Sequence, residues 1–188
     1  PMGTINSVKN INNLIENLPT ETLLCLDEAY IDFVPLKLIP EISKNKPNVI
    51  RMRTFSKAYG MAGARVGYGI AAKDLILNFE KVRNHFGISR ISQVGALESI
   101  YDGDFIIDVI SKVENSKKRI AKIALANNCK IINSFTNFVA IDCCKSAEYA
   151  KKVLESLIRQ GVFVRMPYSF PQNRCIRVTA GLDNDIDL

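Results

Sequence analysis

The stretch TFSKAYGMAGARVGYG, residues 54–69, gathers glycines and polar side chains into one short segment. Ser56 and Lys57 stand near its start, and Arg65 lies among the glycines that follow. Glycine permits backbone conformations and close approaches that other side chains block. The segment therefore predicts a ligand that lies against the main chain, with polar side chains beside it.

Composition limits the kind of protein that carries this segment. The chain has 188 residues, of which 47% are hydrophobic, so it can bury the core of one large domain or two small ones. No apolar run approaches the roughly 20 residues of a membrane helix, and the first residues do not resemble a secretory signal. The net charge of +6 is dispersed along the chain. We therefore expect a soluble cytoplasmic protein without a nucleic-acid or membrane partner.

The basic cluster at 117–122 has apolar residues at helical spacing and no interleaved aromatic residues, which predicts a solvated helix face. The five cysteines form no C-x-x-C pair, and Cys143 and Cys144 are direct neighbours, which predicts reduced thiols. The only histidine, His85, has no second histidine with which to share a metal ion. No metal site is therefore predicted.

Strands flank the glycine-rich segment on both sides. An almost continuous apolar run ends at Asp27, as in a buried parallel strand, and further strands are predicted at 48–56 and 64–71. Helices are predicted at 7–18, 73–86 and 91–102. Ligands of open α/β sheets bind beyond the carboxyl ends of the strands. Asp27, Ser56 and Lys57 should therefore lie at one edge of the sheet.

The pattern changes near residue 105, where we divide the chain. Residues 1–105 are expected to form part of a large α/β domain with a mainly parallel sheet. Residues 106–188 are expected to form a small α+β domain. Its predicted elements are a long helix at 104–128, a strand at 137–143, a helix at 146–160, and strands at 162–167 and 175–181.

The polar residues of the first part fit one cofactor class. A pyridine aldehyde phosphate requires a carboxylate for its ring nitrogen, a phenol near its ring oxygen and an amine that forms a Schiff base. It also requires hydroxyl and guanidinium donors for its phosphate. One candidate exists for each role: Asp27, Tyr30, Lys57, Ser56 and Arg65. Each residue type alone is common on protein surfaces, but their order and spacing favour a shared site.

Four motifs carry a family resemblance: LDEAYIDF (26–33), the opening stretch, GVFVRMP (161–167) and CIRVTAG (175–181). They closely resemble the fold-type I pyridoxal-phosphate aminotransferases, in the histidinol-phosphate aminotransferase branch, over essentially the whole chain. The resemblance implies that pyridoxal 5'-phosphate is bound by Asp27, Tyr30, Ser56, Lys57 and Arg65, with Lys57 as the Schiff-base lysine.

The same resemblance implies that Arg177 binds the acidic group of the substrate, with Arg165 as a second anion-site arginine. The implied reaction transfers an amino group from a donor such as histidinol phosphate or an aromatic amino acid to a 2-oxo acid such as 2-oxoglutarate. It would take place in histidine or other amino-acid biosynthesis and in a homodimer.

Several alternatives stay open at this point. A related decarboxylase would keep Asp27, Lys57 and Arg65. A non-enzymatic relative would need a further domain, and a nucleic-acid binder would need denser positive charge. The first residues, PMGT, stand where the resembled family has PTGT after a cofactor-site asparagine. The chain is therefore expected to be a C-terminal portion that lacks part of the cofactor shell and is inactive alone.

Overall fold

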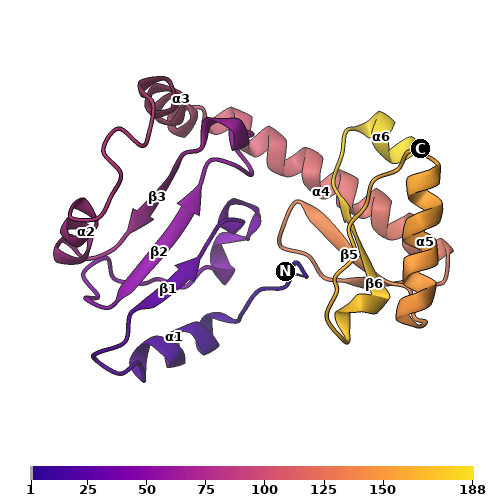
Figure 1. Cartoon of the computed structure of the whole chain (residues 1–188), viewed down its shortest axis with the longest axis horizontal. Coiled ribbons are helices and arrows are strands. Elements are labelled where there is room, and N and C mark those ends of the chain that lie inside the picture. The colour runs from indigo at the N-terminus through magenta and orange to yellow at the C-terminus, as the bar shows by residue number, and fades with distance from the viewer. Residues whose placement is uncertain (1) are drawn as a thin grey trace. The chain divides into compact units, whose positions relative to one another are not determined.

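The computed structural model describes residues 2–188 of an α/β protein. The chain forms two compact units, each with its own three-stranded sheet (Figure 1). One unit is Asn6–Ile107. The other is Asp108–Leu188 together with the segment that ends at Ile5. Among the described residues, no helix has the length and apolar character needed to cross a membrane.

The sheet of the first unit has the strand order β1-β2-β3. Its strands are β1 (Leu24–Asp27), β2 (Val49–Thr54) and β3 (Gly67–Ile70). β1 and β2 are parallel, which confirms the prediction for these two strands, whereas β3 runs antiparallel to β2. The connection 55–66 contains only a 3-10 turn and no α-helix of the kind that usually forms the crossover to a parallel neighbour. The expectation of a mainly parallel sheet was therefore wrong for β3.

Three α-helices belong wholly to the first unit. They are α1 (Val8–Glu16), α2 (Lys73–Glu80) and α3 (Arg90–Tyr101), with 3-10 turns η1 (Ile31–Phe33), η2 (Leu36–Leu38) and η3 (Ala62–Ala64). Ser7 caps α1 as its sequence predicts, since its Oγ accepts the N–H of Asn10 at 3.2 Å. α2 ends before the predicted residue 86. Phe86, almost fully exposed, finds no core there to hold a further helical turn.

A buried carboxylate joins the ends of β1 and β2. Glu28 is only 8% exposed, and its two oxygens accept the Nε–H groups of Arg51 at 2.7 Å and Arg53 at 2.8 Å. Burial alone would lower the pKa of Arg53, but its hydrogen bonds to Glu28 and Tyr68 raise it overall. The N–H of Glu28 also donates to the Met52 carbonyl at 2.8 Å. Glu28 therefore fixes the two strand ends relative to each other through both its backbone and its side chain.

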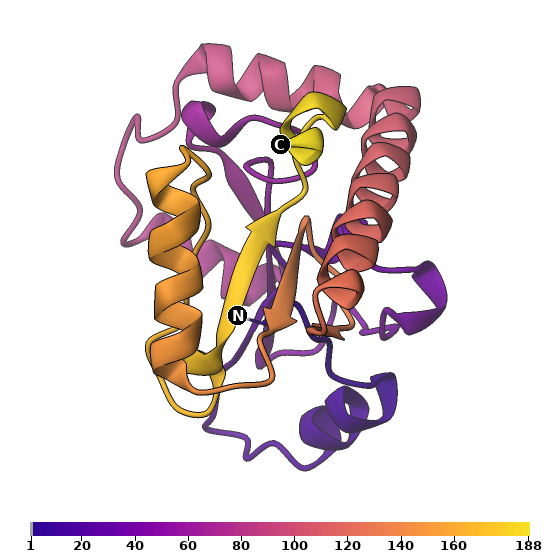
Figure 2. The same cartoon turned by 90° about the vertical axis from the view of Figure 1, so that its right-hand side faces the viewer.

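The second sheet is antiparallel, with the order β4-β5-β6. Its strands are β4 (Lys130–Ile132), β5 (Phe138–Asp142) and β6 (Cys175–Thr179), and its helices are α5 (Ala147–Arg159), α6 (Asp183–Asp187) and the 3-10 turn η4 (Gln172–Arg174). α4 (Gly103–Ala126) begins in the first unit and continues into the second. α5 lies alongside β6 (Figure 2), and apolar residues of α4, α5 and the sheet form the core.

Two elements of this unit differ from the sequence prediction. The segment predicted as a strand at 162–167 forms only an isolated bridge between Arg165 and Arg177. Pro167 has no N–H with which to extend a ladder, so the pairing stays local. β4 was not predicted, because a strand of three residues is too short to show an alternating pattern.

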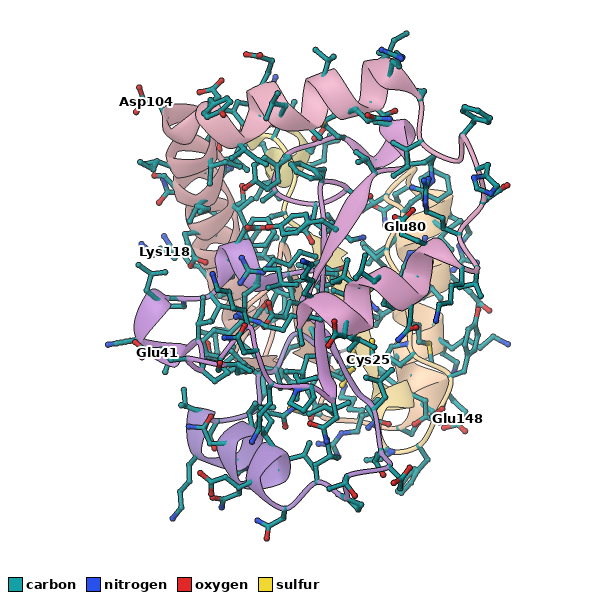
Figure 3. The ribbon with its side chains drawn as sticks, turned by 90° about the vertical axis from the view of Figure 1, so that its left-hand side faces the viewer. Cys25, Glu41, Glu80, Asp104, Lys118 and Glu148 are labelled. Carbon is teal, nitrogen blue, oxygen red and sulfur yellow. The ribbon has the colours of Figure 1, made fainter. Side chains whose placement is uncertain are left out.

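The basic cluster of α4 is not uniformly solvated. Lys118 is exposed and points outward in Figure 3. Lys117 is buried, and its Nζ donates to Glu114 at 2.6 Å and to the Ser134 carbonyl at 2.7 Å. The prediction of a solvated face was therefore wrong for Lys117, because these acceptors satisfy its charge inside the unit.

A second buried carboxylate lies at the end of β5. Asp142 is paired with Arg174, and it also accepts the N–H of Cys144 at 2.8 Å. Burial alone would raise the pKa of Asp142, but these two partners lower it overall. All five cysteines lie in the described part of the chain and are free thiols, and burial raises the pKa of Cys143 to about 11.

Replacing the Glu28 carboxylate should destabilise the first unit. Glu28→Ala leaves two partly buried guanidinium groups without their acceptor, which should lower the free energy of unfolding in urea by about 3 kcal/mol. Glu80→Ala is the matched control, because Glu80 pairs with Arg83 at the surface, where both side chains are more than half exposed. That control should change the stability by less than about 1 kcal/mol. Equal effects of the two substitutions would contradict the role of Glu28.

Asp142 should contribute to stability at neutral pH and less in acid. Its folded-state pKa lies below the ordinary value of 3.8, so its contribution is present above that pH and is lost as the pH falls further. The free energy of unfolding of Asp142→Asn should therefore decline less between about pH 5 and 3 than that of the wild type. Parallel stability curves for the two proteins over this range would contradict the assignment.

Candidate active site

Asp27 is the last residue of β1, at the edge where the parallel strands β1 and β2 both end. Its side chain is exposed, and its Oδ1 accepts the N–H of Ala29 at 3.0 Å. Among the described residues, no cation forms an ion pair with it. Successive side chains of an extended chain point to opposite faces. Glu28 takes the buried face, and Asp27 remains available to a ligand.

Tyr30 and Lys57 come together at this edge. Tyr30 lies half-buried just before η1, and Lys57 lies in the turn that follows β2. The Lys57 Nζ is 5.2 Å from the centroid of the Tyr30 ring, within the range of a cation–π contact. The structure therefore places an amine beside a phenol ring at the strand edge that carries Asp27.

Phe55 closes the loop that carries Lys57. Its N–H donates to the Val66 carbonyl at 3.2 Å, and its carbonyl accepts the N–H of Met61 at 3.0 Å. Its buried ring packs on Tyr59, with the centroids 4.9 Å apart. These contacts fix both ends of the loop. Ser56 lies directly after this anchor, and its N–H donates to Thr54 Oγ1 at 3.0 Å.

Arg65 ends the η3 turn in a left-handed conformation, with φ of 52°. Its exposed guanidinium donates from Nη1 to the Ala62 carbonyl at 2.7 Å. At Gly67, a Cβ would lie only 2.6 Å from the Arg53 carbonyl oxygen. The sequence reading of the glycines as ligand contacts is thus wrong at Gly67, because the neighbouring strand itself excludes a side chain there.

A group of polar residues was missed from the sequence. Burial raises the pKa of Asp32, and burial followed by the charge of Asp32 raises that of Tyr59. Arg53 acts on both groups in the opposite direction. The sequence did contain a signal for a buried acidic partner. Arg51 and Arg53 are two residues apart on a predicted strand, so their side chains point to the same face, where a carboxylate such as that of Glu28 is needed to balance their charge.

Arg165 and Arg177 form a separate group in the second unit. Each donates its backbone N–H to the carbonyl of the other, at 3.0 and 2.6 Å, so they occupy directly opposed positions. The Arg177 guanidinium carbon lies 4.0 Å from the centroid of the Phe138 ring. Like charges placed opposite each other are destabilising unless something compensates them.

The Arg177 Nε is buried and has no hydrogen-bond partner among the described residues. Both arginines line a pocket of about 840 Å³. Lys151, Ser169 and Gln172 also contribute to its lining, which among the described residues contains no Asp or Glu. A cationic pocket with an unused donor suits an anionic group.

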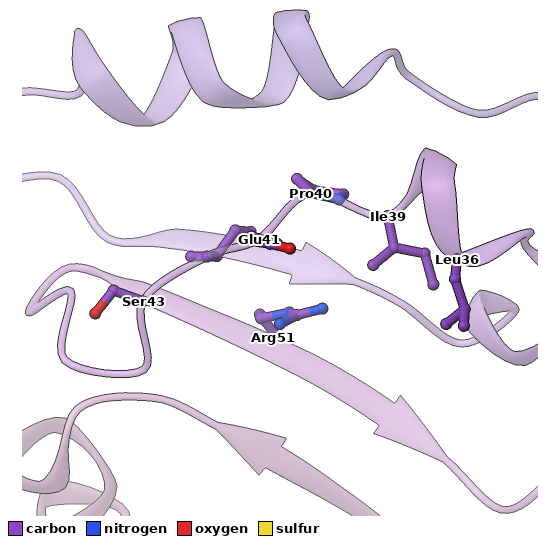
Figure 4. A pocket seen from close by; sticks show the side chains of 7 residues that line it. Leu36, Ile39, Pro40, Glu41, Ser43 and Arg51 are labelled. Carbon is purple, nitrogen blue, oxygen red and sulfur yellow. The ribbon is translucent and has the colours of Figure 1, made fainter.

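A pocket of about 660 Å³ in the first unit has a different character (Figure 4). Leu36, Ile39, Glu41 and Ser43 surround Arg51 there. None of the predicted site residues lines it, and Arg51 is already engaged by Glu28. Among residues 2–188, no cluster of three or more His, Cys, Asp or Glu side chains is arranged to hold a metal ion.

Known proteins share both the sequence and the fold. The family model described as "Aminotransferase class I and II" matches residues 1–187. The histidinol-phosphate aminotransferase of Desulfotalea psychrophila is 34% identical over 187 residues, covering 96% of this chain and 48% of that protein. That of Bacillus velezensis is 36% identical over 184 residues, covering 96% and 50%.

A solved structure agrees with these relatives. The histidinol-phosphate aminotransferase of Sinorhizobium meliloti, in complex with pyridoxal-5'-phosphate, superposes with a TM-score of 0.96 at 44% identity, covering 100% of this chain and 52% of that one. The chain thus spans about half the length of the relatives it matches. With the family model matched from residue 1 to residue 187, the chain belongs to the class I and II aminotransferases.

Proposed function

We propose that the full-length protein is a pyridoxal-phosphate-dependent aminotransferase of the histidinol-phosphate type, with Lys57 as its catalytic residue. The observation that carries this proposal is the Lys57 amine beside the Tyr30 ring, at the strand edge that presents the exposed carboxylate of Asp27. The relatives named above support it, and one of them was solved with the cofactor.

The residues at this edge fit the cofactor chemically. When bound, pyridoxal 5'-phosphate supplies an aldehyde and a ring that withdraws electrons. Asp27, which forms no ion pair within residues 2–188, would accept a hydrogen bond from the ring nitrogen and keep it protonated. Tyr30 would donate its hydroxyl to the ring oxygen. Ser56 and Arg65 would hold the phosphate, Arg65 with the guanidinium donors that Ala62 leaves free.

Lys57 would have two roles. Its Nζ would hold the cofactor covalently in the resting enzyme. When it is not bound to the cofactor, the amine would take the proton from the α-carbon of the substrate as a general base.

The substrates follow from the cationic pocket of the second unit. Arg177 and Arg165 would bind the acidic group of the amino donor and of the 2-oxo acid. Histidinol phosphate and 2-oxoglutarate are the proposed pair, and the names of the relatives support the first of them. A homodimer in the cytoplasm is part of the same proposal. The homodimer is supported by the large apolar side chains that α3 exposes, such as Ile91 and Tyr101.

The first test of this function is covalent trapping at Lys57. Borohydride reduction of the full-length protein with pyridoxal phosphate should add the mass of the reduced cofactor to the peptide that contains Lys57. Lys57→Ala should lose both the adduct and transamination, yet unfold at nearly the wild-type temperature, because the amine performs chemistry rather than packing. Lys73→Ala, an exposed lysine at the start of α2, is the control and should label normally.

Other results would redirect the assignment. An adduct on a different lysine would overturn the role of Lys57. Release of carbon dioxide from an amino acid substrate, without transfer of its amino group to a 2-oxo acid, would indicate the related decarboxylase activity instead.

The second test concerns the anion site. Arg177→Ala in the full-length enzyme should raise KM for the phosphorylated donor and for the 2-oxo acid by about a hundredfold, corresponding to a lost charge-assisted hydrogen bond of about 3 kcal/mol. The absorbance of the bound cofactor should not change, because the lost contact is to the substrate. Arg177→Lys should also be impaired, since an ammonium cannot reproduce the two parallel bonds of a guanidinium.

The control for Arg177 is Arg159→Ala, because Arg159 is an exposed arginine of α5 outside the pocket lining. It should leave both KM values within about twofold of the wild type, as expected for a surface charge. Unchanged KM values in Arg177→Ala would remove this arginine from the substrate site.

A further inference from the structure

Ser92 is a buried serine within α3, only 7% exposed. Its Oγ donates to the carbonyl oxygen of Ala64 at 2.7 Å, in a segment far away in the sequence. Its Oγ also lies 2.9 Å from the Oγ of Ser89, the residue that caps α3. Because a carbonyl only accepts, the single proton of Ser92 points to Ala64, and the Ser89 hydroxyl must donate to Ser92.

These bonds form a continuous chain from the start of α3 to the glycine-rich loop. Hydroxyl groups linked in series polarise one another, so each bond is stronger than it would be alone. The chain ends on the carbonyl directly before Arg65. That carbonyl belongs to the peptide group that joins Ala64 to Arg65. The orientation of this peptide group therefore sets the position of the Arg65 backbone.

Arg65 needs such support, because its left-handed φ of 52° is unfavourable for a residue with a side chain. Strained backbone of this kind persists only where its surroundings hold it. α3 provides those surroundings with its small residues. A Cβ at Gly95 would lie 3.0 Å from the Met61 Cε, and Ala96 packs into the cluster of Phe55 and Val66.

We propose that Ser92 is a positioning residue that holds Arg65 in the conformation that presents its guanidinium to the cofactor phosphate. The hydroxyl acts on the phosphate only through the Ala64 carbonyl and Arg65. This inference rests on the proposed function, because that function gives Arg65 its phosphate role.

The test compares two cofactor forms that differ only in the phosphate. Affinities of the full-length protein for pyridoxal phosphate and for pyridoxal are measured by absorbance titration. Ser92→Ala should weaken the binding of pyridoxal phosphate about tenfold, the effect of one lost buried hydrogen bond, and leave pyridoxal binding within about twofold. Arg65→Ala should show the same selective loss, but a larger one, since it removes the phosphate donor itself.

Ser99→Ala is the matched control. Ser99 is also a partly buried serine of α3, but its Oγ donates within the helix to the Gly95 carbonyl at 2.7 Å and contacts Met61, not Ala64. It should leave the ratio of the two affinities unchanged. Ser92→Cys keeps the shape of the side chain with a weaker donor, so it should give an intermediate loss and serves if Ser92→Ala does not fold.

Four outcomes would overturn the inference or the proposed function on which it rests. Equal weakening of pyridoxal and pyridoxal phosphate in the Ser92 variants would show a general structural role. Unchanged affinity for both would show that Arg65 does not depend on Ser92. A wild-type protein that labels on Lys57 but binds both forms equally would refute the phosphate role of Arg65 alone, whereas failure to label on Lys57 would refute the proposed function itself.

Discussion

The strand edge of the first unit depends on the carboxylate of Glu28, held between the guanidinium groups of Arg51 and Arg53. A buried carboxylate is stable only where partners replace the water it has lost, and two Nε–H donors on one strand meet that requirement. Because Glu28 directly follows Asp27, this constraint also fixes the carboxylate on the other face of β1. Glu28 thus pairs with the buried arginines, while the neighbouring Asp27 stays available to a ligand.

The loop after β2 shows a similar division between support and function. Phe55 closes the loop through backbone hydrogen bonds to Val66 and Met61. Ser92, which belongs to α3 and not to the loop, donates a hydrogen bond to the Ala64 carbonyl. Between these anchors, Lys57 contacts the Tyr30 ring and Arg65 donates to the Ala62 carbonyl, and neither side chain belongs to the buried cluster around Phe55. α3 turns its small residues toward the loop and large ones such as Val94 to solvent, the reverse of an ordinary surface helix. The face of α3 that contacts the loop therefore carries small residues, because the loop packs closely against it.

Charge in the second unit is arranged differently. Arg165 and Arg177 oppose each other across a single bridge, and the buried Nε of Arg177 has no partner among the described residues. A core built only for stability would pair these groups, as it pairs Asp142 with Arg174. The Arg177 guanidinium lies over the face of the Phe138 ring, and its donor without a partner is what makes this pocket chemically suited to an anion.

Local patterns in the sequence were sufficient to predict the order of the candidate site residues and the strand ends near Asp27 and Lys57, because apolar runs and glycine-rich turns can be recognised without the fold. The sequence also predicted that Arg177 lies on a strand. Only the tertiary structure revealed the direction of β3 and the burial of Glu28 and Lys117. It alone also revealed the hydrogen bond from Ser92 to Ala64 and the single bridge at Arg165. Each depends on which distant residue supplies a hydrogen-bond partner or an opposite charge, and no local pattern records that partner.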